Sequence, residues 1–219
     1  MIWQRADLWV LAIGASAALA IWGRSPDRIV LHWVFKPLAT ACIGGALLVL
    51  APASFARNLF AVGVLLSLLG DVFLMMPARW FIAGLGSFLA SLLTYAVAFS
   101  FRVPLSPRQG VYFVLPAAVG VLVLRHLWPH LVGKRAKLRI PIALYVLAMS
   151  SMVWRALSLF DGPSVSLQAW LVGAVGASLF MTSDSLLAFR RFADHKLSAR
   201  VDLGIYYAAQ TALVFCWIV

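Results

Sequence analysis

The chain has 219 residues, of which 63% are hydrophobic and only 11% are charged. Soluble domains carry about 25% charged residues, and the mean hydropathy of this chain is +0.96. A globule of this length cannot bury so many apolar side chains, so the composition indicates a protein that lies mostly in lipid. It excludes a soluble enzyme, a disordered segment and a secreted domain held together by disulfides.

The chain is strongly basic, with 18 Lys and Arg residues against seven Asp and no Glu. These cations lie between apolar runs, a position typical of topology signals and of contacts with lipid headgroups. We therefore expect no nucleic-acid partner. Cys42 and Cys216 lie inside apolar runs and indicate neither an exposed disulfide nor a metal site.

Eight apolar segments, most of them about as long as a membrane-spanning helix, follow one another along the chain. They cover residues 8–22, 30–50, 58–76, 80–101, 110–128, 138–160, 167–189 and 201–219. Because the alternating pattern of a porin is absent, we predict an all-α polytopic bundle of about eight transmembrane helices, forming one domain over residues 1–219. The first segment, LWVLAIGASAALA, also fits a signal peptide, but we favour a retained helix.

The loops alternate between a strongly and a weakly basic set. The strongly basic set holds Arg24, Arg28, Arg79, Lys134, Arg135, Lys137, Arg139, Arg190, Arg191, Lys196 and Arg200. The weakly basic set holds Arg5, Arg57, Arg102 and Arg108. The positive-inside rule places the first set in the cytoplasm and both termini outside, and we expect a bacterial inner (plasma) membrane.

Two segments far apart in the sequence resemble each other. LLGDVFLMMPARWF ends the third span and MTSDSLLAFRRF ends the seventh. In each, a small residue precedes an Asp, and apolar residues, an Arg and an aromatic residue follow. Since each half would hold four spans, a duplication would be a parallel 4+4 repeat about an axis along the membrane normal. It would bring Asp71 and Asp184 toward that axis.

Few ionisable residues lie within the predicted spans, and each is costly in lipid and so a functional candidate. Asp71, Asp184, Lys36 and Asp202 all fall near the cytoplasmic ends of their spans, whereas Arg155 lies toward the outer side. Four groups at one depth predict a polar pocket that opens toward the cytoplasmic leaflet.

Helical spacing adds polar neighbours to this pocket. Asp202, Tyr206 and Gln210 are four residues apart and share a face, and Ser67 precedes Asp71 by one turn. The predicted pocket residues besides Asp71 and Asp184 are Lys36, Ser67, Tyr95, Asp202, Tyr206, Tyr207 and Gln210.

Two close carboxyl groups in a low-dielectric pocket do not both ionise easily. One then keeps its proton and acts as a general acid, while the other stays charged and activates water. A nearby Lys would balance their charge. The residues alone leave three alternatives open: a catalytic pocket, a proton- or ion-coupled transport site, and a buried Asp–Lys ion pair that only fixes the helix register.

Several short motifs together resemble a known family. They are FKPL in span two, LLGDVFLM in span three, LFMTSDSLLAFRRF in span seven and YYAAQ in span eight, with Gly84, Phe88 and Tyr95 in span four. The pattern is similar to that of the YhhN, or lysoplasmalogenase, family of multi-pass membrane proteins, from about residue 35 to 210. The family often has a His one turn before the span-four Tyr, where this chain has Ser91 and Leu92.

The resemblance implies a lipid ether hydrolase. Such an enzyme cleaves the vinyl ether bond of a lysoplasmalogen to a fatty aldehyde and a glycerophospho-alcohol. It implies Asp71 and Asp184 as catalytic acid and base, with Lys36, Tyr206 and Gln210 lining the pocket. Acid protonation of the alkene carbon requires neither a metal nor an organic cofactor.

The implied partners are a lysophospholipid substrate and the surrounding membrane lipid. We expect the substrate phosphate to meet Arg79, Arg190 or Arg191 at the cytoplasmic rim of the pocket. The alternative is a proton-coupled transporter or lipid-handling membrane protein that uses the same buried carboxylates.

Overall fold

The computed structural model describes residues 2–219, with side chains from Ala6 onward, so the side chain of Arg5 lies outside the described part. The described chain contains eight α-helices joined by loops and short 3-10 turns, and no strands. The helices are α1 (Ile2–Trp22), α2 (Ile29–Leu50), α3 (Phe55–Met75), α4 (Phe81–Arg102), α5 (Gly110–Leu127), α6 (Arg139–Leu157), α7 (Leu167–Phe192) and α8 (Ala199–Phe215). The predicted all-α bundle is confirmed.

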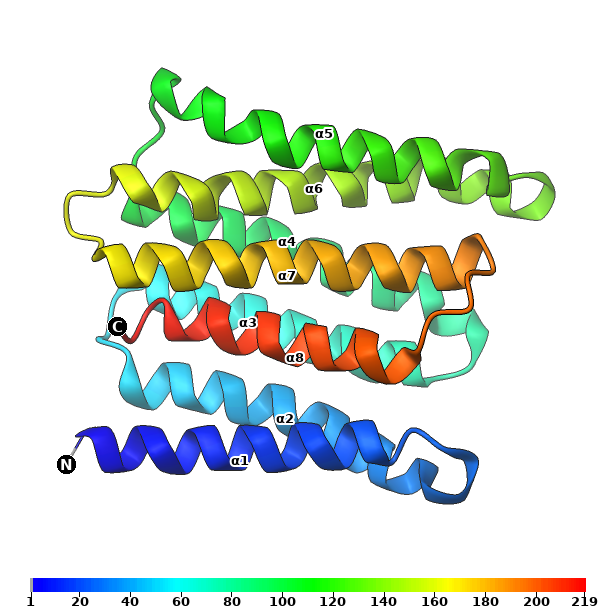
Figure 1. Cartoon of the computed structure of the whole chain (residues 1–219), viewed down its shortest axis with the longest axis horizontal. Coiled ribbons are helices and arrows are strands. Elements are labelled where there is room, and N and C mark those ends of the chain that lie inside the picture. Colours follow the sequence, from blue (N-terminus) through cyan, green and yellow to red (C-terminus); the bar gives the residue numbers. More distant parts are fainter. Residues whose placement is uncertain (1) are drawn as a thin grey trace.

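Six helical segments, from Pro26–Leu50 to Leu167–Phe192, are long and apolar enough to cross a membrane. The part of α1 whose side chains are described, Ala6–Trp22, is shorter, and so is α8. Both helices run alongside the other six (Figure 1). Polar caps mark some of the helix starts. The hydroxyl of Ser54 accepts from the backbone N–H of Arg57 at 3.1 Å before α3, and Ser166 does the same for Ala169 at 2.9 Å before α7.

The helices form a ring with two outliers. Around the ring, α2, α3, α4, α6, α7 and α8 each contact the next, and α8 closes on α2. Helix α1 packs outside α2, and α5 packs outside α6 (Figure 1). The order of contacts is the same for α1 to α4 as for α5 to α8 around the ring, as a parallel 4+4 repeat predicts. A common origin of the two halves stays a prediction.

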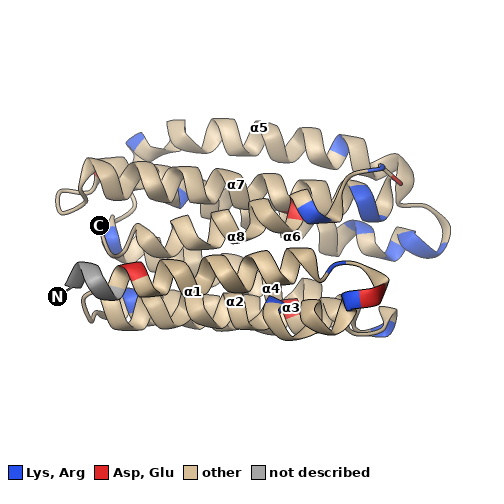
Figure 2. Ribbon diagram, turned by 60° about the horizontal axis from the view of Figure 1, so that its bottom comes forward, with Lys and Arg blue, Asp and Glu red and all other residues tan. Residues whose placement is uncertain are grey.

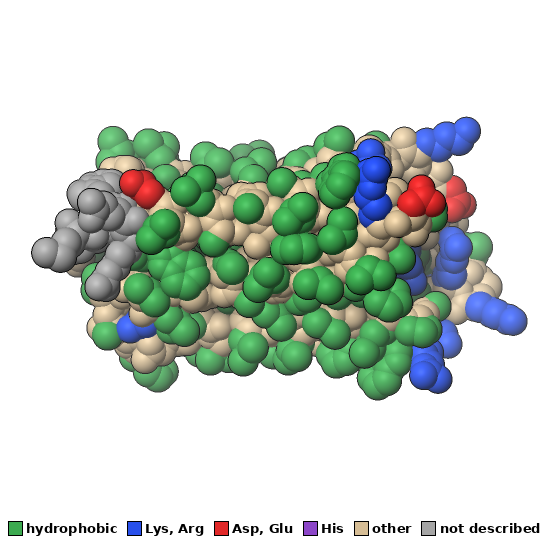
Figure 3. Space-filling model, turned by 90° about the horizontal axis from the view of Figure 1, so that it is seen from below, with side chains coloured by type: hydrophobic (Ala, Val, Ile, Leu, Met, Phe, Trp, Pro, Cys, Tyr) green, Lys and Arg blue, Asp and Glu red, His purple; other side chains and the backbone are tan. Residues whose placement is uncertain are grey.

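The two ends of the bundle differ in charge. The loops between α1 and α2, α3 and α4, α5 and α6, and α7 and α8 meet at one end, where most Lys and Arg residues gather (Figures 1 and 2). Both termini lie at the opposite end (Figure 1). Apolar side chains cover the flank between the two ends (Figure 3). We call the end with more Lys and Arg the basic end.

Buried side chains fill the half of the bundle near the termini. Phe60 stacks on Tyr95 with ring centroids 4.2 Å apart, and Phe99 and Trp217 extend this layer. Helices α3 and α4 approach closely because Gly63 has no side chain; a Cβ there would lie 2.5 Å from the Tyr95 ring. Toward the basic end the core divides into this main cluster and a smaller one between α5, α6 and α7.

Candidate functional site

A cavity of about 680 Å³ lies between these two clusters at the basic end of the ring. Its volume is within the range of about 300–1,000 Å³ that is common for small-molecule sites. Residues from α2 to α8 line it. The predicted pocket residues on its wall are Lys36, Asp71, Asp184, Asp202 and Tyr206.

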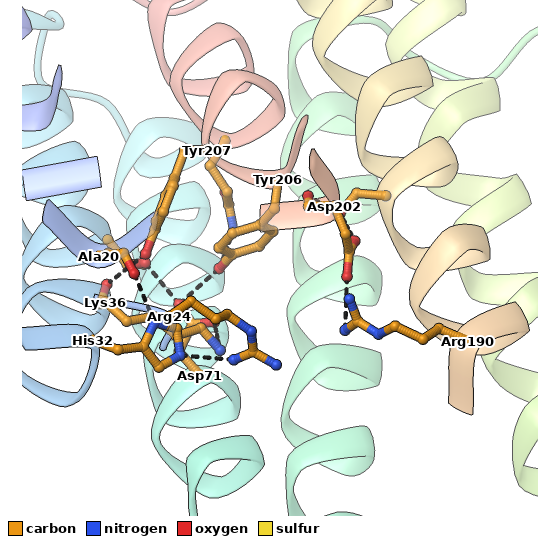
Figure 4. Close-up of polar contacts among 12 residues, drawn as sticks. Ala20, Arg24, His32, Lys36, Asp71, Arg190, Asp202, Tyr206 and Tyr207 are labelled. Carbon is orange, nitrogen blue, oxygen red and sulfur yellow. Dashed lines mark hydrogen bonds and ion pairs between the residues drawn. The ribbon is translucent and has the colours of Figure 1, made fainter. Parts of the chain in front are cut away.

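Asp71 on α3 is 1% exposed and is surrounded by donors. Its Oδ1 atom lies 3.1 Å from Nζ of Lys36. Its Oδ2 atom accepts hydrogen bonds from Thr40 at 2.7 Å and from Tyr206 at 2.9 Å (Figure 4). A carboxylate has about four acceptor positions, so these three contacts leave one position free. Asp71 is therefore an ion-paired carboxylate that can accept one further proton donor.

Asp184 on α7 has a different environment. It is half-buried and accepts a hydrogen bond from the hydroxyl of Tyr145 on α6. Among the described side chains, no Lys or Arg lies within ion-pair distance of it. The two carboxyl groups thus face one cavity with unlike partners: a cation and two hydroxyls for Asp71, and a single phenol for Asp184.

The third acid of the cavity, Asp202, is paired. Its Oδ2 atom lies 3.0 Å from Nη2 of Arg190, and its Oδ1 atom accepts from Ser183 at 3.0 Å (Figure 4). Nη1 of Arg190 is buried and has no hydrogen-bond partner among the described atoms. Arg190 therefore neutralises Asp202 and keeps one donor group available.

A chain of hydrogen bonds lies behind Tyr206. Gln210 donates to the Tyr206 hydroxyl at 3.3 Å and accepts from the Tyr95 hydroxyl at 2.9 Å. Tyr95 in turn lies 3.5 Å from the hydroxyl of Ser67, which contacts Ser91 at 2.7 Å. These residues lie one layer behind the cavity wall. The chain ends on the backbone carbonyl of Gly63, which accepts from Ser91 at 2.8 Å.

Tyr207 also lies off the cavity wall, and its hydroxyl donates to the backbone carbonyl of Lys36 at 3.4 Å. The geometry therefore divides the predicted residues into two groups. Lys36, Asp71, Asp184, Asp202 and Tyr206 face the cavity, whereas Ser67, Tyr95, Tyr207 and Gln210 support them from behind. Direct binding of substrate by the second group stays a prediction.

Four guanidinium groups surround the mouth of the cavity. They belong to Arg24, Arg135, Arg190 and Arg191. Arg190 and Arg191, two of the three residues expected to meet the substrate phosphate, line the cavity. The third, Arg79, does not line it, because it lies on the exposed turn Ala78–Trp80 between α3 and α4.

Arg24 is fixed from the side by a buried histidine. The Nε2 atom of His32 lies 2.9 Å from Nη1 of Arg24, and its Nδ1 atom lies 2.9 Å from the carbonyl of Ala20 (Figure 4). Burial of the guanidinium and, second, the charge of Arg190 lower the pKa of Arg24. An anion between Arg24 and Arg190 would relieve this repulsion, so the mouth favours a negatively charged group.

Three contacts of this site were absent from the sequence-based prediction: Thr40, Tyr145 and Arg24. Thr40 follows Lys36 by one helical turn, which was a usable signal. Tyr145 is the only Tyr of its span, and it occupies the helix that corresponds to α2 in the repeat. Within the described residues, no set of three or more His, Cys, Asp or Glu side chains is arranged for a metal ion.

Known proteins with similar sequences include several named lysoplasmalogenase. Human lysoplasmalogenase TMEM86B is 35% identical over 185 residues, which cover 82% of this chain and 74% of the human one. A Mycobacterium bovis lysoplasmalogenase is 35% identical over 226 aligned residues, covering 94% of this chain and 81% of that protein.

Other similar proteins carry only a family name. The membrane protein YhhN of Escherichia coli O6:H1 is 32% identical over 181 residues, covering 81% of this chain and 82% of its own. No solved structure matches the chain. The family model for YhhN matches residues 31–217. This multi-pass membrane protein therefore belongs to the YhhN family.

Proposed function

We propose that the protein is an intramembrane lipid ether hydrolase of the lysoplasmalogenase type. It would cleave the vinyl ether bond of a lysoplasmalogen to a fatty aldehyde and a glycerophospho-alcohol. The similarity to proteins named lysoplasmalogenase supports this reaction class. The observation that carries the proposal is that Asp71 and Asp184 line one cavity in unlike surroundings. Such a pair is suited to separate acid and base roles.

Asp184 is the proposed general acid. Without a cation to balance its charge, a carboxyl group in an apolar bundle is more stable as the neutral acid. Tyr145 fixes its orientation through the hydrogen bond to Oδ2. A neutral carboxyl group beside the alkene is what protonation of a vinyl ether carbon requires.

Asp71 is the proposed base. Lys36, Thr40 and Tyr206 hold the carboxylate in place and leave about one acceptor position for a water molecule. The buried chain through Gln210 and Tyr95 keeps the Tyr206 hydroxyl oriented toward Asp71. In this arrangement Asp71 positions a water molecule and removes its proton.

The reaction follows in three steps whose protons balance. Asp184 donates its proton to the alkene carbon, which produces an oxocarbenium ion beside the new Asp184 carboxylate. Water adds to the cationic carbon while Asp71 takes one of its protons, and a hemiacetal forms. The C–O bond to the glycerol oxygen then breaks as Asp71 returns its proton to that oxygen and Asp184 takes the hydroxyl proton. Aldehyde and alcohol leave, and both side chains regain their starting states.

The substrate phosphate is proposed to lie at the cavity mouth. Arg24 and Arg190 offer a pair of cations there, and the unpartnered Nη1 of Arg190 is a ready donor. By the positive-inside rule, this mouth would face the cytoplasmic leaflet of a bacterial inner membrane, with both termini outside. Lysophospholipid would then reach the site from that leaflet.

A transport function with the same carboxylates is less favoured by the packing. Alternating access requires the site to open toward both sides of the membrane. Between the cavity and the other end lie the buried rings of Phe60, Tyr95 and Phe99, and Trp217 stacks on Phe99. Opening that side would require this whole layer to move.

Aldehyde release from a lysoplasmenyl-ethanolamine by the purified protein in detergent tests the proposal. We expect release by the wild type and loss of release in both Asp71→Asn and Asp184→Asn. Asp161→Asn is the matched control, because Asp161 is exposed in the loop between α6 and α7, at the end opposite the cavity, and accepts from Tyr112. A folded wild type that releases no aldehyde would contradict the proposed reaction.

A further inference from the structure

Apolar side chains form one part of the cavity wall, and we call this part of the cavity the apolar arm. Its wall there comes from α4, α5 and α6, through Phe81, Leu85, Val123, Leu127, Ile142 and Val146. The arm begins directly beside the proposed acid, because Tyr145, which bonds Asp184, precedes Val146 in α6. A polar site and an apolar arm in one cavity suit a ligand with a polar end and a hydrocarbon end.

On the side of Asp71 that faces away from the basic end, side chains close the cavity. Phe88, Met149 and Tyr206 form the floor of the cavity, with the hydrogen-bonded layer of Gln210 and Tyr95 beneath. The lining residues extend from Leu138, which directly precedes α6, to Met149 in α6, and at 1.5 Å per residue this gives a depth of roughly 16 Å. That is about half of the hydrocarbon core of a bilayer, which is ~30 Å thick, or the span of one leaflet.

The side of the arm toward α5 adjoins the membrane. Helix α5 lies outside the ring and contacts mainly α6. Two contacts to α6 hold α5 up to Gly120: the Trp154 indole donates at 2.6 Å to the carbonyl of Gln109, the residue before α5, and Gly120 lies against Ser150. In the second half, Val123 faces the cavity and is 6% exposed, whereas Val121 is 56% exposed on the outer surface.

The wall between α4 and α5 consists of side chains. These two helices share no extended interface among the described pairs. Phe81 at the start of α4 packs against the apolar cluster that contains Val123 and Leu127 of α5. It also meets Phe192 of α7 edge-on with centroids 5.9 Å apart, and the guanidinium of Arg191 covers its ring at 4.2 Å. Rotation of a few side chains, without movement of a helix, would open this wall to lipid.

We propose that the apolar arm binds the hydrocarbon chain of a single-chain phospholipid, which enters sideways from the membrane between α4 and α5. This inference rests on the proposed function, which gives the position of the headgroup and of the reacting bond. The depth of the apolar arm and its position beside α5 indicate where the hydrocarbon chain lies. With the phosphate at the arginine mouth, the bond next to the chain lies at the level of Asp71 and Asp184. From there the hydrocarbon chain of the lipid turns past α6 toward α5.

Photo-crosslinking tests the location of the chain independently of turnover. The probe is a lysophosphatidylcholine with a diazirine at the end of its chain, irradiated with the full-length Asp184→Asn protein in lipid nanodiscs. We expect label on Val123 and Leu127 of α5 or on Phe81 and Leu85 of α4, and its removal by excess unlabelled lysophosphatidylcholine. Excess unlabelled lysophosphatidylcholine should not remove label from the outward-facing Val121. Competable label confined to α1 and α2, or none in the arm, would overturn the proposal.

A pair of substitutions tests the same point through selectivity. Val123→Trp fills the arm, and Val121→Trp is the matched control on the outer face of the same turn. For Val123→Trp we expect the ratio of kcat/KM for long-chain over short-chain vinyl ether lipids to fall about tenfold, with the ratio of Val121→Trp unchanged. Equal losses for both chain lengths would overturn the chain site. If the wild type hydrolyses neither lipid, the proposed function fails, and the crosslinking still decides the arm.

Discussion

In each half of the bundle the second, third and fourth helices follow one another around the ring and the first packs against the second, but the chemistry of the two halves differs. In the first half, α2 supplies Lys36 and Thr40 to Asp71 on α3. In the second half, α6 supplies only Tyr145 to Asp184 on α7, and its neighbouring positions Ile142 and Val146 are apolar. Equivalent positions therefore carry an ion-paired carboxylate on one side and an unpaired carboxyl group on the other.

The outer helices differ in the same way. Beside α1, the space near the site holds polar groups, with His32 bonded to Arg24 and Tyr207 bonded to the Lys36 backbone. Beside α5, the corresponding space is the apolar arm of the cavity. The bundle thus separates a charged side, which in the proposed mechanism holds the water and the headgroup, from an apolar side, which would hold the acid and the hydrocarbon chain. The proposed chemistry depends on this asymmetry.

The largest expected effect is on the charged side. Lys36→Met leaves the buried Asp71 without its cation, and breaking a buried ion pair in this way costs about 3–5 kcal/mol of stability. We expect a lower free energy of unfolding, measured in a mild detergent by chemical denaturation, together with loss of aldehyde release.

The double variant Lys36→Met/Asp71→Asn separates stability from activity. Removing both charges should recover most of the lost stability while activity stays absent. Recovery of both properties would show that the ion pair only fixes the helices and that Asp71 takes no part in turnover.

Tyr145→Phe should have a smaller effect, on the other side. It removes one hydrogen bond to Asp184, worth about 0.5–1.5 kcal/mol, or a loss of up to about tenfold in kcat. The matched control is Tyr112→Phe, which removes a Tyr–Asp hydrogen bond at the far end of the bundle. Similar kcat values for the two variants would contradict the positioning of Asp184 by Tyr145.

Arg24→Gln should have the smallest effect. Because Arg24 as a whole residue is exposed although its guanidinium is partly buried, we expect KM for a phosphate-bearing substrate to rise only by about threefold, with kcat nearly unchanged. A vinyl ether without a phosphate should show no change. Arg79→Gln, outside the cavity, is the control, and an equal rise in KM there would indicate general attraction of anionic lipid rather than a phosphate site.

The bundle and the meeting of Asp71 with Asp184 were predictable from the sequence. Apolar run lengths determine the spans, and loop charges bring their basic ends together. The partners of each side chain were not predictable, because they depend on how far each helix rotates about its axis, and packing sets that rotation. Arg190, one of the three Arg residues expected to meet the phosphate, pairs with Asp202, and Arg24 lines the cavity although Arg79 was expected there instead.

In the proposed mechanism, Asp184 carries a proton at neutral pH and Asp71 does not. Infrared spectra of the protein at neutral pH test it directly, through the carbonyl band of a protonated carboxyl group and its shift in D₂O. We predict that this band disappears in Asp184→Asn and persists in Asp71→Asn. A band that disappears in Asp71→Asn and persists in Asp184→Asn would contradict the account.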